Sequence, residues 1–193
     1  MSIRRAVRLV RPETEDQLHA YIKTVLGFRM PRRPLIDGHD APFEYISHAF
    51  FEDRLPRECV VWANRGGGKT QIGAIVTLLD MLFKPGIQVR ILGGSLDQSS
   101  KMYGYLKQLL EDDVFRDLVA GRITGRMVSL VNGSAVEVLS QSERAVRGHR
   151  VHKLRCDEVE LFEPEVWDAA QMVTRSGMCG DTFVRASIET LST

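Results

Sequence analysis

Hydrophobic positions along the chain follow two different periods, and this pattern predicts strands and helices that alternate. Short apolar runs predict strands at residues 59–63, 87–92, 152–156 and 182–188. Residues 127–131 and 135–139 flank Asn132-Gly133-Ser134, which predicts a β-hairpin. Helical spacing predicts helices over residues 42–51, about 69–83, 97–110 and 164–175. Together these elements predict a mostly parallel, three-layer α/β sheet with ligands at the carboxyl ends of its strands.

The first forty residues have a pattern of their own. Their apolar side chains recur at helical spacing within residues 12–28, at Leu18, Tyr21, Ile22, Val25 and Leu26. Residues 29–34 (Arg-Met-Pro-Arg-Arg-Pro) follow, and their prolines exclude a continuous helix. We interpret residues 1–40 as a helical arm and basic linker, and residues 41–193 as the main domain. The basic segment is either a solvated connector or a nucleic-acid contact.

Composition restricts the class of protein. A chain of 193 residues with 44% hydrophobic and 26% charged residues is typical of one globular domain. Its net charge of +1 argues against a protein that coats nucleic acid by charge alone. No apolar segment approaches the length of a membrane span, and the N-terminus lacks the apolar core of a signal peptide. Three widely spaced cysteines (Cys59, Cys156 and Cys179) predict reduced thiols and a cytoplasmic protein.

The segment after the first predicted strand carries the strongest functional signal. It reads Asn64-Arg65-Gly66-Gly67-Gly68-Lys69-Thr70-Gln71 and opens a predicted helix. Glycines let successive backbone N–H groups point at a polyphosphate, and the helix start adds its free amides and positive dipole end. Lys69 can then reach the β- and γ-phosphates, while the Thr70 hydroxyl can ligate Mg²⁺. The alternative is a plain glycine turn, since Ala63 stands where the strict pattern has glycine.

Two adjacent acids follow the predicted strand at residues 152–156. We expect Asp157 to face the metal and Glu158 to activate water beside the γ-phosphate. Such a pair is common by chance, but here it stands downstream of a glycine-rich phosphate loop in an alternating α/β pattern. Lys153 and Arg155 interrupt the apolar character of the strand. We expect the next acids, including Glu160, to lie at the N-terminal end of the following helix.

In combination these motifs resemble the ATPase domain of the large terminase subunits of tailed bacteriophages, which pump DNA into preformed capsids. The resemblance covers about residues 41–193. Four features carry it: Arg65 four residues before Lys69, the segment Gly94-Ser95-Leu96-Asp97-Gln98, the run Ala145-Val146-Arg147-Gly148, and the hydroxyl-rich end Thr190-Leu191-Ser192-Thr193. The phosphate loop and the acid pair are also shared with many helicases and translocases.

The resemblance implies a three-layer P-loop NTPase of the ASCE or RecA-like type, with helices on both faces of its sheet. It also implies roles for individual residues. Arg65 adds a phosphate contact, and Arg147 is an arginine finger for a neighbouring subunit or else an ordinary surface arginine. Pro42, Phe43 and Glu44 stand where the family has its adenine-side residues, with glutamate in place of an amide. Thr190, Ser192 and Thr193 are candidates for the motif that couples hydrolysis to movement.

The resemblance further implies ATP and Mg²⁺ as cofactors, double-stranded DNA as substrate, and a homo-oligomeric ring, a pentamer in the family. Portal protein and the small terminase subunit are the implied partners, in the cytoplasm of the infected host and without a membrane. The family continues into a nuclease domain, for which no residues remain, so we expect an excised ATPase domain. The alternatives are a helicase-like translocase and a non-catalytic nucleotide-binding module. The acid Glu158 argues against the second.

Overall fold

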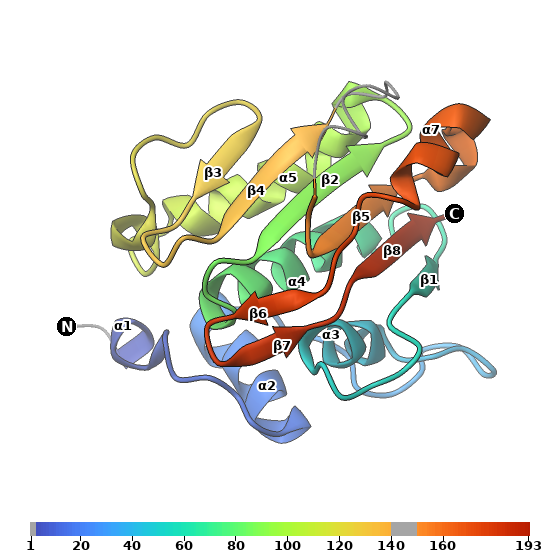
Figure 1. Ribbon diagram of the computed structural model, residues 1–193. Coiled ribbons are helices and arrows are strands. Elements are labelled where there is room, and N and C mark those ends of the chain that lie inside the picture. Colours follow the sequence, from blue (N-terminus) through green and yellow to red (C-terminus); the bar gives the residue numbers. More distant parts are fainter. Residues whose placement is uncertain (1–2, 140–149) are drawn as a thin grey trace.

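The computed structural model describes residues 3–139 and 150–193, and a six-stranded sheet lies at its centre (Figure 1). In spatial order the strands are β1 (Cys59–Trp62), β8 (Ser187–Ser192), β5 (Lys153–Asp157), β2 (Gln88–Gly93), β4 (Ala135–Leu139) and β3 (Met127–Ser129). All neighbours pair in parallel except β3 and β4, which form the predicted hairpin. The carboxyl ends of the parallel strands therefore meet at one edge.

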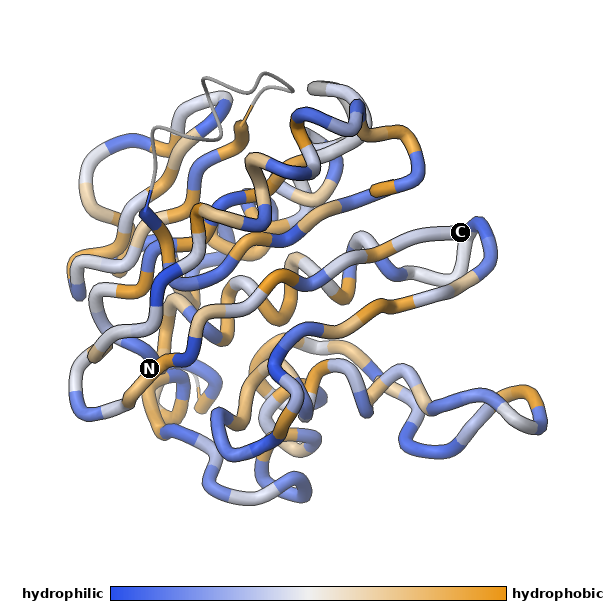
Figure 2. Tube along the Cα trace, turned by 45° about the vertical axis from the view of Figure 1, so that its right-hand side comes forward, coloured by the Kyte–Doolittle hydropathy of each residue, from blue (hydrophilic) through white to orange (hydrophobic). Residues whose placement is uncertain are grey.

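Helices cover both faces of the sheet, which confirms the predicted three-layer architecture (Figure 1). On one face lie α4 (Lys69–Phe83) and α5 (Leu96–Glu111), with α3 (Pro42–Phe50) packed on α4. The other face carries α7 (Pro164–Ala170). Each face has its own hydrophobic cluster, built around α4 and α5 on one side and α7 on the other. The hydrophobic residues accordingly concentrate in the strands and inner helices, as the hydropathy colouring shows (Figure 2).

The N-terminal arm packs on the main domain. It consists of α1 (Ile3–Val7), α2 (Glu15–Tyr21) and a short π-helical turn, η1 (Ile22–Leu26). Leu18 and Ile22 are fully buried in the hydrophobic cluster that also contains α4. Arg4 forms an ion pair with Asp112 at 3.0 Å, just beyond the end of α5. Within the linker, Arg32 is paired with acids of α2. The described residues include no helix long and apolar enough to cross a membrane.

Two predicted elements near the C-terminus differ from the structure. The expected helix over residues 164–175 ends at Ala170, because the chain then turns to pair with the start of β5: the Arg175 amide donates to the Val151 carbonyl at 2.7 Å. The expected strand over residues 182–188 is wrong. It is divided between β7 (Thr182–Val184), which forms a separate hairpin with β6 (Gly177–Cys179), and β8, which begins at Ser187. Two short 3₁₀ turns complete the fold: η2 (Arg116–Leu118) and η3 (Val159–Leu161).

Candidate nucleotide site

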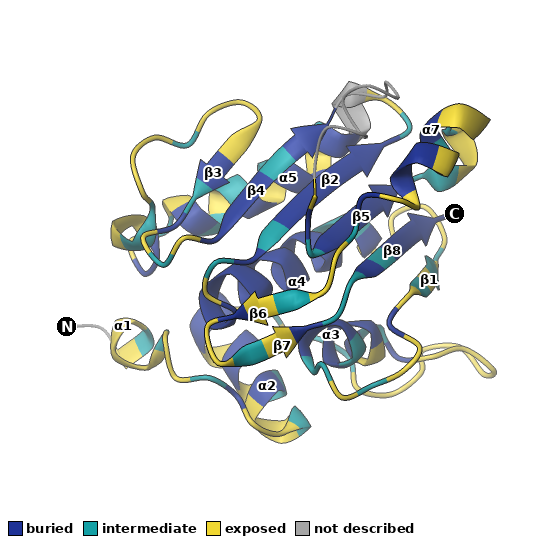
Figure 3. Cartoon of the chain, viewed as in Figure 1, coloured by how far each residue is buried: buried dark blue, intermediate teal, exposed yellow. Residues whose placement is uncertain are grey.

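The glycine-rich loop between β1 and α4 has a backbone shape that its glycines make possible. Gly66 and Gly68 have φ angles of +80° and +79°, a left-handed region that other residues rarely adopt. A Cβ on Gly67 would lie 2.8 Å from Oδ1 of Asn64. The loop is held by the Gly67 amide, which donates to the Asn64 carbonyl at 3.1 Å. Residues 64–68 are all exposed, so this curled backbone is open to a ligand (Figure 3).

The helix after the loop begins at Lys69, as predicted. Gly68 occupies the N-cap position and has no side chain to bond the first-turn amides. The Ile72 amide donates to the Gly68 carbonyl at 2.9 Å. Unbonded amides at a helix start, with the positive end of the helix dipole, form a binding site for anionic phosphate oxygens. Lys69 adds a positive charge at the same place, although its side chain is largely buried.

The two predicted Mg²⁺ ligands lie together although 87 residues separate them in the sequence. Thr70 Oγ1 donates to Oδ2 of Asp157 at 3.0 Å, and Asp157 is the last residue of β5. Its other oxygen, Oδ1, is buried and has no hydrogen-bond partner. Burial raises the pKa of Asp157, and the nearby carboxylate of Glu158 adds to this, while Thr70 and Lys69 oppose it. A buried carboxylate oxygen without a partner is suited to a cation.

These residues fit a magnesium ion of the kind that P-loop proteins use. Mg²⁺ keeps several waters and needs only one or two protein oxygens besides the phosphates of its substrate. The hydroxyl of Thr70 and the carboxylate of Asp157 supply such a pair. Elsewhere the described residues contain no group of three His, Cys, Asp or Glu side chains able to hold a metal by themselves.

Glu158, the predicted general base, follows Asp157 in a strained conformation. With φ +56° and ψ +54° it is the one non-glycine residue of the described chain that has a positive φ. Strain of this kind costs about 1–3 kcal/mol and is concentrated at functional sites. Its amide donates to the Leu191 carbonyl at 2.7 Å, which ties the turn to β8. The side chain therefore leaves the chain at the carboxyl edge of the sheet, next to Asp157.

Glu160 contacts the predicted coupling motif, and sequence reasoning missed this. It accepts hydrogen bonds from the Ser192 hydroxyl and from Thr193 Oγ1, the latter at 3.4 Å. We expected Glu160 at the start of the next helix, but that is wrong because η3 turns it back onto the end of β8. Burial raises the pKa of Glu160, but these hydrogen bonds and the charge of Lys69 outweigh it and hold the pKa below its ordinary value. No spacing in the sequence signals this contact.

The end of β8 also contacts the phosphate loop. The Ala63 amide donates to the Ser192 carbonyl at 3.1 Å, and Thr190 Oγ1 donates to the Cys59 carbonyl of β1 at 3.3 Å. The three predicted coupling residues therefore join β1, β8 and Glu160. The coupling role itself stays a prediction.

The predicted adenine-side residues are placed less favourably. The Phe43 ring is 1% exposed and is enclosed by His19, in an edge-on contact, and by the Arg32 guanidinium 5.2 Å from its centre. Pro42 occupies the first turn of α3, and Glu44 is an exposed residue whose carboxylate lies 3.8 Å from Arg54. No face of the Phe43 ring is open for stacking, so this assignment stays a prediction.

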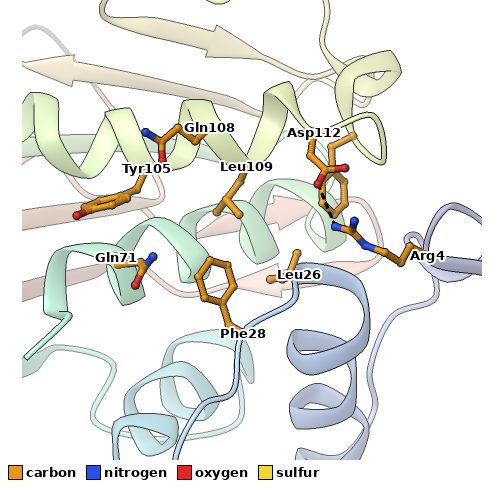
Figure 4. Close-up of a pocket in the computed structure, with 9 residues that line it drawn as sticks. Arg4, Leu26, Phe28, Gln71, Tyr105, Gln108, Leu109 and Asp112 are labelled. Carbon is orange, nitrogen blue, oxygen red and sulfur yellow. Dashed lines mark hydrogen bonds and ion pairs between the residues drawn. The ribbon is translucent and has the colours of Figure 1, made fainter.

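A pocket of about 180 Å³ lies between α4 and α5, beside Gln71 (Figure 4). Gln71 and Gln108 contribute side-chain amides, and Phe28 and Tyr105 contribute aromatic rings. Because Gln71 comes two residues after Lys69, the pocket begins close to the predicted phosphate site. The sequence analysis assigned Gln71 to the nucleotide site but gave no sign that Phe28 would face it.

Two motifs of the sequence analysis are only partly placed. The run at residues 145–148, with the candidate finger Arg147, lies outside the described residues. The Gly94 amide donates to the Asp157 carbonyl at 3.1 Å, so the segment before α5 begins directly beside the acid pair. The position of Arg65 is known only as an exposed residue of the phosphate loop.

A strand, a glycine loop and a helix, with a strand-end aspartate bonded to the helix's first turn, define a P-loop nucleotide-binding domain of the α/β class. The large terminase of bacteriophage HK97 has a similar fold, with a TM-score of 0.66 and 14% identity, over 93% of this chain and 37% of that one. The large terminase of a thermophilic bacteriophage gives 0.55 and 12%, over 76% and 38%. The complex of that same terminase with ADP gives 0.54 and 12%, over 76% and 37%.

These likenesses show the fold of a phage large-terminase ATPase domain. The chain spans 37–38% of the length of these solved terminases. Neither a protein-family model nor a curated protein sequence matches it.

Proposed function

We propose that this chain is the ATP-hydrolysing motor domain of a phage large terminase, which moves double-stranded DNA into a procapsid. The observation that carries the proposal is the contact between Thr70 and Asp157, with the second Asp157 oxygen buried and unbonded beside the phosphate loop. A terminase-like fold supports the same conclusion.

In the proposed mechanism the amides of the loop and of the first turn of α4 bind the phosphates, together with Lys69. Thr70 and Asp157 would hold Mg²⁺, which neutralises charge on the phosphate oxygens when bound. Glu158 accepts a proton from the attacking water and so makes it a better nucleophile. The strained backbone of Glu158 supports this assignment, because it fixes the side chain at the strand end.

We place the adenine base in the pocket beside Gln71. Aromatic rings stack on bases, and side-chain amides can bond their edges. Phe28 and Tyr105 supply the first feature there, and Gln71 and Gln108 the second. The buried ring of Phe43 favours this pocket over the segment Pro42-Phe43-Glu44.

DNA translocation, a homo-oligomeric ring, the portal and small-subunit partners, and action in the host cytoplasm are carried over from the family. Arg147 is the candidate finger that a neighbouring subunit would insert, which would couple hydrolysis to ring assembly. A helicase-like translocase is the second candidate, because the same site chemistry would serve it. Unwinding of a forked duplex by the assembled protein would favour that candidate.

The test is a titration of the chain with ATPγS in the presence of Mg²⁺, followed by calorimetry. We expect saturable binding that Lys69→Ala abolishes. Lys107→Ala is the matched control, since this lysine lies on the exposed side of α5, where its one ion pair with Glu111 has a separation of 3.7 Å. Equal binding by the wild type and Lys69→Ala would contradict the proposed phosphate site.

A further inference from the structure

The face of β5 that packs against α4 is charged, whereas a strand buried between two layers is normally apolar. Lys153, Arg155 and Asp157 occupy alternate positions of the strand and are at most 3% exposed. They face the helix that starts with the phosphate-binding residues. The interface between the predicted metal strand and the predicted phosphate helix is therefore made by polar contacts.

Arg155 is at the centre of these contacts, and each of its three side-chain nitrogens is bonded. Nη1 donates to Thr77 Oγ1 at 2.9 Å, and Nη2 donates to Asp80, both on α4. Nε donates to Oε2 of Glu189 at 2.9 Å, and Nη2 also reaches Oε1 of Glu189 at 3.3 Å. Glu189 is the residue directly opposite Arg155 on the neighbouring strand β8. One planar side chain thus fixes three elements to one another.

The same set of charges extends toward the other end of the strands. Lys153 and Lys84 pair with Glu52 at 2.9 and 2.6 Å, and Lys84 also pairs with Asp80 at 2.6 Å. Tyr45 of α3 donates to Glu189 at 2.7 Å. Three carboxylates and three cations therefore share one buried cluster: Glu52, Asp80, Glu189, Lys84, Lys153 and Arg155.

Stability alone does not explain such a cluster. Replacing a buried ion pair with apolar residues is often neutral or stabilising by about 1–4 kcal/mol, because burial removes the hydration of both charges. Charged groups differ from apolar ones in that they fix distances and directions. At this interface the directed contacts set how α4 lies along β5.

The position of Arg155 relates it to the nucleotide site. It stands two residues before Asp157 on the same face of β5, and Thr77 stands two helical turns after Thr70 on the same face of α4. The contacts Asp157–Thr70 and Arg155–Thr77 are thus successive links across one interface. A shift of the helix along the strand would break both.

We propose that Arg155 is a positioning residue for the nucleotide site: by bonding α4 and β8 together, it sets the Thr70–Asp157 spacing that a magnesium–triphosphate complex requires. This inference rests on the proposed function. Glu189 and Thr77 act in it as the partners that hold Arg155. The phosphate loop itself does not depend on Arg155, because its shape comes from its own glycines.

The test separates binding of the phosphates from binding of the metal. The affinity of the whole chain for ATPγS is measured by calorimetry in EDTA and again in Mg²⁺, and the ratio of the two affinities is the magnesium gain. Arg155→Lys keeps the charge but loses the planar set of donors. We expect it to keep the wild-type affinity in EDTA and to lose about tenfold in magnesium gain, as when a metal ligand loses a residue that orients it.

Lys84→Gln is the matched control. It removes a cation from the same buried cluster, yet Lys84 follows the end of α4, far along the helix from Thr70. We expect a lower melting temperature and an unchanged magnesium gain. If Arg155→Lys unfolds, Thr77→Val replaces it, since that change removes only one hydroxyl and should lower the gain in the same direction.

An unchanged magnesium gain in folded Arg155→Lys, or an equal loss in Lys84→Gln, would overturn the inference and leave the proposed function intact. A wild-type chain without any magnesium gain would overturn the proposed magnesium site, and the inference with it.

Discussion

Replacing Gly68 with alanine changes the backbone of the phosphate loop without adding a clash. Gly68 has a φ of +79°, and a Cβ built there meets no atom within 4 Å. The effect is therefore conformational. Gly86 provides a matched control, because it lies just past the other end of α4, has a φ of +84°, and is equally open. Both variants force alanine into the same left-handed region at the two ends of one helix.

The cost to folding should be similar in the two variants. A left-handed conformation costs a non-glycine residue about 1–2 kcal/mol. Alanine also restricts the unfolded chain, which offsets about 0.4–1 kcal/mol. We therefore expect each variant to lose about 1 kcal/mol of unfolding free energy, or about 2–4 °C in melting temperature for a chain of this size.

The cost to nucleotide binding should differ. If alanine relaxes out of the left-handed region, the amides of the loop no longer point at one ligand. A hydrogen bond to a charged group contributes about 1.5–3 kcal/mol, so the loss of one amide–phosphate bond lowers affinity about tenfold or more. We expect this loss for Gly68→Ala and none for Gly86→Ala, with thermal unfolding and ATPγS calorimetry on both. Equal affinities in the two variants would refute the role given to the loop backbone.

Four further predictions use single variants. Glu158→Gln should retain ATP binding and stop turnover in a steady-state ATPase assay, whereas Glu160→Gln should retain basal turnover and lose its stimulation by DNA; the reverse result would exchange the two roles. Asp157→Asn should abolish the difference in ATPγS affinity between Mg²⁺ and EDTA. Gln71→Ala should weaken ATP more than inorganic triphosphate, and equal weakening would remove the base from that pocket. Burial raises the pKa of Glu189, but Arg155 outweighs it and holds the pKa below its ordinary value, so the ionised form stabilises the fold. Its contribution is present above about pH 4.3 and is lost as the pH falls further, so the melting temperatures of wild type and Glu189→Gln should converge in acid.

Much of the site could be predicted because its signals are local or follow from topology. The loop and the start of α4 depend on neighbouring residues, so Gly66, Gly68 and Lys69 could be read directly. The contact between Thr70 and Asp157 is not local. It could be predicted because parallel strands bring their carboxyl ends to one edge of a sheet.

Other contacts could not be predicted, since they depend on how side chains meet across elements. The turn at Glu158 sends Glu160 back to Ser192, and no period in the sequence encodes that turn. Arg155 looked like an interruption of an apolar strand, because its partners Thr77 and Glu189 lie on a helix and a strand far away along the chain.

The boundary of β8 was missed for a physical reason as well. Residues 182–188 are apolar enough to read as one strand, yet Thr182–Val184 pairs with Gly177–Cys179 across a tight turn at Gly180, whose φ is +59°. The chain then enters the main sheet only at Ser187, opposite Lys153. Hydrophobic pattern alone does not tell which strand a segment joins.

The most direct measurement is a crystal structure of the chain with Mg²⁺ and ATPγS. The account predicts the phosphates within hydrogen-bond distance of the amides around Gly66–Gly68 and of Lys69, with a metal ion bound to Thr70 and Asp157. A nucleotide bound elsewhere, or phosphates in the loop with no metal near Asp157, would contradict it.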